Sequence, residues 1–169
     1  MTFLVLFARK MMLKNQFSDL NYRLMQKEQE LQDLQSYTAA IADGEVSLND
    51  LSTAPASMFG NLTQYMVGSN NYAMNAAQTQ YGAMGGQMTQ VSSDAMAQQQ
   101  YQQLVFKNLY DTQKQQYLKA EQAKLHVKEK SIENEKLKLE QQLKLIETEL
   151  SSLDKSIDNG IKDAVPQYA

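Results

Sequence analysis

The side chains that could support acid–base or metal chemistry are few in this sequence. The 169 residues include one histidine, His126, and no cysteine. Without a second histidine or a thiolate, His126 lacks the usual partners of a zinc site or of an activated nucleophile. We therefore interpret His126 as a residue on the flank of a helix, and we predict no metal site, no cofactor and no enzymatic activity.

A group of glutamates in the C-terminal third raises the question of a di-metal helix bundle. Such bundles combine inward-facing carboxylates with Glu-x-x-His pairs, and no such pair occurs here. The sequence predicts a solvated helix face instead. Its members are Glu129, Glu133, Glu135, Glu140, Glu147 and Glu149.

Two glycine-containing stretches resemble parts of ligand-binding loops. Residues 43–46, Asp-Gly-Glu-Val, match the second half of a calcium loop, but Ala39 and Ile41 then stand where oxygen ligands belong. A helix stop followed by a capping turn accounts for these residues better. Residues 82–86 contain three glycines but lack the lysine of a phosphate-binding loop.

The basic residues do not predict a nucleic-acid partner. Lys124, Lys128 and Lys130 lie close together, but Glu121 and Glu129 stand among them, and the net charge of the chain is −3. Binding to a phosphate backbone requires positive charge that is not opposed locally.

The elements that carry these residues are expected to be long helices. Only two prolines and seven glycines occur, so most of the chain lacks helix breakers. Apolar residues recur at alternating intervals of three and four near both ends, which is the pattern of a coiled-coil seam. The predicted interaction seam consists of Leu13, Phe17, Leu20, Leu24, Leu31, Leu34, Ile41, Leu118, Leu125, Ile132, Leu139, Leu143, Ile146, Leu150, Leu153 and Ile157. Polar residues break the seam at Lys27, Thr38, Glu129 and Lys136.

The fold predicted from this pattern is all-α, a long coiled coil folded into an antiparallel helical hairpin. We expect an N-terminal coiled-coil helix over 1–43, an uncharged connecting segment with short helices over 44–93, a long C-terminal helix over 94–158 and a frayed tail over 159–169. The expected boundaries are a stop at Gly44, a capping box at Ser47 and Asp50, helix starts at Pro55 and at Ser92 or Ser93, and helix ends at Gly68 and Gly85–Gly86.

The first eight residues form an apolar run that Arg9 and Lys10 end. The run is too short to span a bilayer, and no basic region precedes it as in a signal peptide. We expect a first helical turn that is buried or docked on a partner. A shallow membrane contact through residues 3–8 is the second interpretation, and a natural start at Met11 or Met12 is the third. The sequence favours the cytoplasm, or export without a cleavable signal peptide.

Charge distribution separates the middle of the chain from its ends. Asp94 is the single charged residue between positions 51 and 106, and such a stretch suits a surface that is covered on assembly. The sequence therefore predicts a structural or assembly protein that binds other helices, as a homo-oligomer or with a partner protein. Two alternatives stay open: a subunit of an exported filament, secretion apparatus or virion-like particle, and a tether at a membrane surface.

Overall fold

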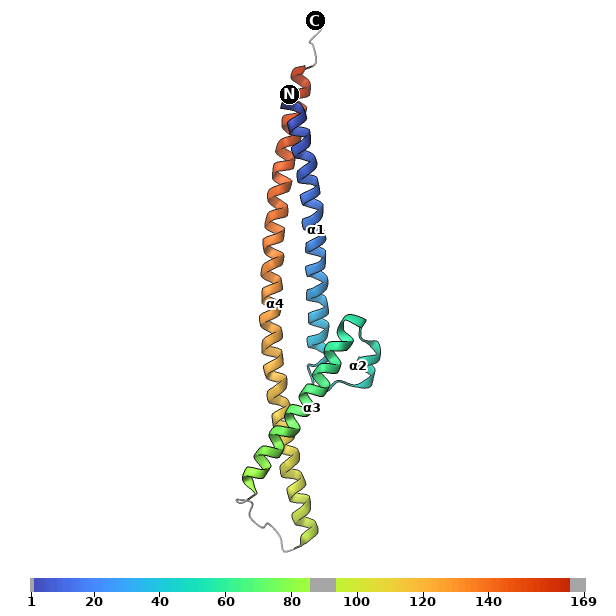
Figure 1. Ribbon diagram of the computed structural model, residues 1–169, viewed down its shortest axis with the longest axis vertical. Coiled ribbons are helices and arrows are strands. Elements are labelled where there is room, and N and C mark those ends of the chain that lie inside the picture. Colours follow the sequence, from blue (N-terminus) through green and yellow to red (C-terminus); the bar gives the residue numbers. More distant parts are fainter. Residues whose placement is uncertain (1, 86–93, 165–169) are drawn as a thin grey trace. The chain divides into compact units, whose positions relative to one another are not determined.

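The computed structural model describes residues 2–85 and 94–164, and within these ranges it contains four α-helices and no strand (Figure 1). The all-α prediction is confirmed. The helices are α1 (Thr2–Ala40), α2 (Leu48–Thr53), α3 (Ala56–Met84) and α4 (Ala95–Ala164).

The chain divides into two compact units. Unit 1 combines Met1–Gln32 with Lys130–Ala169, and unit 2 is Asp33–Glu129. Unit 1 is therefore built from the first part of α1 and the last part of α4. Unit 2 contains the end of α1, all of α2 and α3, and the beginning of α4.

Helix α1 ends at Ala40, three residues before the expected end at 43, and a turn over 41–43 leads to Gly44. Gly44 has a φ of +76°, a left-handed conformation that is strained for residues with a Cβ atom. A Cβ at this position would also lie 3.3 Å from Cδ2 of Leu118. Gly44 thus satisfies both the backbone turn and the close approach of α4.

Helix α2 begins with the predicted capping box. The Ser47 hydroxyl accepts a hydrogen bond from the backbone N–H of Asp50 at 3.1 Å, and the Asp50 carboxylate accepts one from the Ser47 backbone N–H at 2.8 Å. The Ser47 hydroxyl also donates a hydrogen bond to the Asp50 carboxylate at 2.6 Å. This bond and the one from the Ser47 backbone N–H lower the pKa of Asp50, because both favour its charged form.

Helix α3 corrects two expectations. It does not end at Gly68 but continues to Met84, where Gly85 caps it, so the connecting segment holds one long helix besides the short α2. Position 68 requires a small residue, because a Cβ there would lie 2.7 Å from the Tyr117 hydroxyl. The buried face of α3 consists of Met58, Leu62, Tyr65, Ser69, Ala73 and Ala77.

We expect Gly68→Ala to behave differently from alanine substitutions at the other helical glycines. Gly60→Ala and Gly82→Ala meet no atom within 4 Å, so each should stabilise the fold by about 0.5–1 kcal/mol through helix propensity. Gly68→Ala gains the same propensity but displaces the Tyr117 ring. It should therefore be neutral or destabilising in urea denaturation, and a gain equal to that of Gly60→Ala would contradict the contact.

The bounds of α4 also differ from expectation at the C-terminal end. The carboxylate of Asp94 accepts a hydrogen bond from the backbone N–H of Met96 at 3.0 Å at the start of the helix, whereas Ser92 and Ser93 lie outside the described residues. The helix passes Asp158 and Gly160 and ends at Ala164. A single glycine costs a helix about 1 kcal/mol, which burial of Ile157 nearby offsets.

Two residues in the first turn of α1 are not buried within the chain. Leu4 and Val5 are 80% and 66% exposed, so the expectation of burial is wrong for these residues. Docking on a partner stays a prediction.

Candidate interaction surfaces

Every residue of the predicted seam is buried or partly buried in its unit. In unit 1 the most deeply buried are Leu13, Ile132, Leu143, Leu153 and Ile157. In unit 2 they are Leu34, Ile41 and Leu125. The remaining members are partly exposed: Phe17, Leu20, Leu24, Leu31, Leu118, Leu139, Ile146 and Leu150.

Ion pairs join α1 and α4 within unit 1. The Lys27 ammonium lies 2.9 Å from Glu135 and 2.9 Å from Glu30, and the Lys136 ammonium lies 3.4 Å from Glu28. Both interhelical pairs join residues 27 and 28 of α1 to residues 135 and 136 of α4.

Two further pairs lie nearer the start of α1. Arg9 bonds to Glu149, with its Nε 2.9 Å from the carboxylate, and Lys10 pairs with Asp154. These four charged side chains lie along the edge of the apolar seam.

Lys27 and Lys136, the two polar breaks of the seam in unit 1, therefore place charged groups along the edge of the seam. The hydrogen bond from Lys27 to Glu30 raises the pKa of Lys27 most, and its hydrogen bond to Glu135 raises it further. Both bonds stabilise the charged ammonium. Ion pairs as exposed as these add little stability. They restrict which residues of α4 can lie beside α1, because a shift of register would separate the charges.

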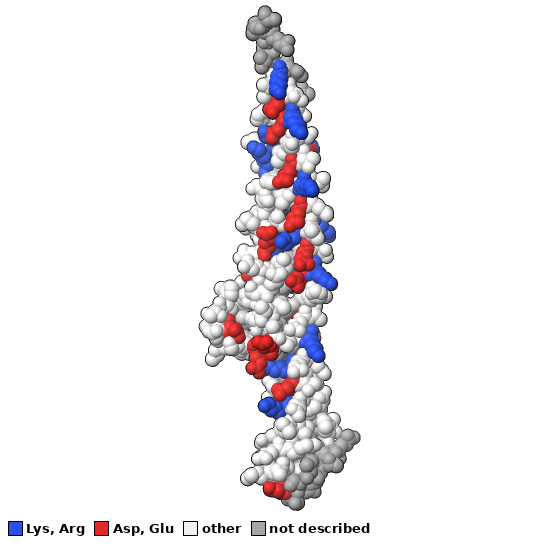
Figure 2. All heavy atoms as spheres, turned by 180° about the vertical axis from the view of Figure 1, so that it is seen from behind, with Lys and Arg blue, Asp and Glu red and all other residues white. Residues whose placement is uncertain are grey.

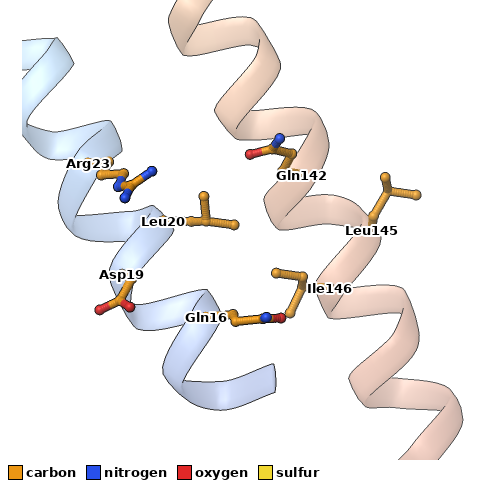
Figure 3. A pocket seen from close by; sticks show the side chains of 7 residues that line it. All are labelled: Gln16, Asp19, Leu20, Arg23, Gln142, Leu145 and Ile146. Atoms are coloured by element: carbon orange, nitrogen blue, oxygen red, sulfur yellow. The ribbon is translucent and has the colours of Figure 1, made fainter. Parts of the chain in front are cut away.

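A groove of about 410 Å³ opens between α1 and α4 in unit 1. In Figure 3 the side chains of Leu20 and Ile146 point into the space between the helices, and Gln16 reaches toward Ile146. The carboxylate of Asp19 points away from α4 in the same view. The seam is thus incompletely filled here, which explains the partial exposure of Leu20 and Ile146.

A cluster of tyrosines around Glu121 forms the centre of unit 2. The centroids of the Tyr65 and Tyr117 rings lie 5.8 Å apart, and those of Tyr72 and Tyr117 lie 5.5 Å apart. Tyr37 is 6% exposed. Tyr37, Tyr65, Tyr117 and Glu121 also line a single cavity of about 370 Å³.

Burial raises the pKa of Tyr37 and of Tyr65, and the Glu121 carboxylate raises each further. A phenolate would lose hydration and face a negative charge in this cluster. The Tyr65 hydroxyl has no hydrogen-bond partner among the described residues. Both hydroxyls are therefore held neutral, and the cluster acts as apolar packing with a polar edge.

We expect the stability of unit 2 to fall above about pH 10, the ordinary pKa of tyrosine. Between that pH and the raised pKa of Tyr37, the unfolded chain releases a proton that the folded chain keeps, so unfolding becomes more favourable. The contribution is complete below pH 10 and is lost as pH rises through the folded pKa. Urea denaturation at about pH 8, 10 and 11 should show a smaller loss for Tyr37→Phe than for the natural chain, and equal losses would contradict this.

The heptad pattern did not predict the tyrosine cluster, although the sequence contains a signal for the burial of Tyr37. Strict heptad spacing assigns Thr38 to the seam between Leu34 and Ile41, whereas the structure buries Tyr37. The Thr38 hydroxyl donates to the Leu34 carbonyl of its own helix at 2.8 Å. Tyr37 lies three residues after Leu34 and four before Ile41, which suits the 3.6-residue period of a straight helix equally well.

Unit 2 also exposes apolar side chains on α3, which carries no charged residue, and near the start of α4. Phe59, Val67 and Met74 follow one another at intervals of eight and seven on α3, and Met96 and Leu104 lie eight apart on α4. Each is more than 40% exposed. We call these five residues the charge-free surface. In Figure 2 the lower end of the view is largely white, that is uncharged, with an acidic side chain at its edge. Exposed apolar side chains mark protein interfaces where they gather into a patch.

The residues considered above for chemistry are not brought together. His126 is exposed, with its Nδ1 3.7 Å from Glu129. Within residues 2–85 and 94–164 no three histidine, cysteine or acidic side chains lie close enough to hold a metal ion. Asp43, Gly44 and Glu45 line a groove with lysines of α4, and Lys114 lies 3.5 Å from Glu45.

None of the helices, over the part of the chain that the structure describes, is both long and apolar enough to cross a membrane.

Neither a protein-family model, nor a curated protein, nor a solved structure matches this chain.

Proposed function

We propose that this protein is a structural or assembly protein that acts by helix–helix association, with further copies of itself or with helices of a partner protein. In this proposal α1 and α4 form an antiparallel coiled-coil hairpin, and unit 2 presents a binding surface. The charge-free surface on α3 and α4 carries the proposal.

Physical chemistry supports this surface as an interface. Three of the five apolar side chains lie on α3, which carries no charged residue. Covering all five releases water from apolar area. Methionine adapts its shape to a partner and needs no preformed pocket. The apolar 3-4 series of α1 and α4, edged by ion pairs, supports the coiled-coil part of the proposal.

Methionine oxidation by dilute peroxide tests the association. Met74 and Met96 are exposed in the single chain, whereas Met58 is 4% exposed and serves as the internal control. We expect the oxidation rates of Met74 and Met96 to fall as the protein concentration rises or when cell extract is added, because an interface excludes the oxidant. Val67→Asp should abolish this protection, since it places a charge within the surface.

The outcome that contradicts the proposal is equally defined. If Met74 and Met96 react at one constant rate at every concentration and with extract present, the charge-free surface is not an interface. A constant slow rate for Met58 would show that the fold was intact throughout.

A further inference from the structure

The exposed side of α1 in unit 1 carries a second apolar 3-4 series. It consists of Leu4, Ala8, Met11, Asn15, Ser18, Tyr22 and Met25, all of them exposed. We call these residues the outer stripe. Five of the seven are apolar, and Leu4, Met11, Tyr22 and Met25 are each more than 60% exposed.

The outer stripe lies opposite the seam that faces α4. Met11 and Asn15 each stand two residues from Leu13, and two residues correspond to about 200° around a helix. Leu13 is 3% exposed, whereas Met11 is 71% exposed. Helix α1 therefore has two apolar sides, and unit 1 covers only one of them.

We propose that the outer stripe binds the outer stripe of a second copy of this chain, with the two α1 helices parallel and in register. This inference rests on the self-association in the proposed function and names its surface. In heptad terms Ala8, Asn15 and Tyr22 take one core position, and Leu4, Met11, Ser18 and Met25 take the other.

The residues beside the stripe are complementary in this arrangement. In a parallel pair, the side chain just before one core position meets the side chain five residues further along the other helix. Lys14 then faces Asp19 of the second copy, and Asp19 faces its Lys14. Both side chains are exposed, and neither forms an ion pair among the described residues.

The other two flanking pairs match in the same way. Phe7 would meet Met12, apolar against apolar, and Asn21 would meet Gln26, amide against amide. An antiparallel pair brings like heptad positions together instead, so Lys14 would have no acidic partner. A buried asparagine such as Asn15 fixes register in parallel coiled coils at some cost in stability.

A membrane surface fits the outer stripe less well than a second copy of the chain does. Asn15 and Ser18 in its middle would lose hydration in the acyl region, and Asp19 would face anionic head groups. A second copy accommodates all three residues.

Single cysteines test the geometry, because the natural chain has no cysteine. Met11→Cys and Met25→Cys should each form a disulfide-linked dimer on mild oxidation, since identical core positions meet only in a parallel, in-register pair. Ser151→Cys, at an exposed position on α4, is the matched control and should stay monomeric on a non-reducing gel. Disulfide formation no faster at positions 11 and 25 than at 151 overturns the proposal.

Charge reversal tests the pairing of the full chain in sedimentation equilibrium at low salt. Lys14→Asp and Asp19→Lys should each raise the dimer dissociation constant about tenfold, because two contacts change from attraction to repulsion. Mixing the two variants should restore association, since each supplies the charge that the other lacks. A mixture that stays as weak as its components overturns the proposal. Circular dichroism should show unchanged helix content, because both side chains are exposed.

Two further results separate this inference from the proposed function. If Met74 and Met96 are protected at high concentration while Met11 and Met25 are oxidised at a constant rate, the outer-stripe dimer is overturned and the charge-free interface stands. If the chain instead binds anionic vesicles, with Lys14→Asp weakening and Asp19→Lys strengthening binding, the stripe contacts lipid and the dimer is overturned.

Discussion

Replacing Leu143 with alanine is expected to lower the free energy of unfolding by about 2–5 kcal/mol, the range for a leucine truncated in a packed core. Leu143 is 8% exposed in unit 1, and its side chain belongs to the seam between α4 and α1. The loss has two parts, the transfer of the removed methyl groups and the cavity left behind. Urea denaturation followed by circular dichroism at a fixed protein concentration measures it.

Leu145 provides the matched control for this substitution. It is the same residue type in the same helix, two positions away, but it is 69% exposed. Leu145→Ala should change stability by less than about 0.5 kcal/mol. If both alanine variants lost equal stability, the seam would not distinguish the two faces of α4 and its register would be wrong.

The two long helices could be predicted from sequence because their information is local. Leu118, Leu125 and Ile132 recur every seven residues with no glycine or proline between them, and one such spacing specifies both helix and buried face. The capping box at Ser47 and the stop at Gly44 are equally local, since each depends on residues at most four apart.

The course of α3 could not be predicted because its reason lies elsewhere in the chain. The residues next to Gly68 predict a helix end there. In the structure, the missing Cβ of Gly68 instead makes room for the hydroxyl of Tyr117, 49 residues later in the sequence. The same limit applies to Phe59, a large apolar residue that is 50% exposed. Long-range packing decides both positions.

The outer stripe escaped the sequence pattern for a different reason. A helix that is apolar on one side is the ordinary expectation, and the 3-4 series from Leu13 to Leu24 already supplies one apolar side. Exposure separates them: Leu13 is buried, whereas Met11 and Tyr22 are not. The sequence contains both series, and the structure assigns each its face.

Replacing Leu62 with alanine is expected to have an effect of comparable size in unit 2. Leu62 is 0% exposed and is among the most completely buried large side chains of the described residues. It lies on the face of α3 between Met58 and Tyr65. Its truncation should cost about 2–5 kcal/mol, and the upper half of that range applies if the neighbouring rings cannot move into the cavity.

Phe59→Ala is the control that makes the result specific, because it removes a larger side chain from a half-exposed position on the same helix. At low protein concentration it should cost less than about 1 kcal/mol, since about half of the side chain already contacts water. If hydrophobicity alone set the loss of stability, Phe59→Ala would cost more than Leu62→Ala. Burial predicts the opposite order. A larger loss for Phe59→Ala than for Leu62→Ala would mean that α3 is rotated about its axis, with the charge-free surface facing the interior of unit 2.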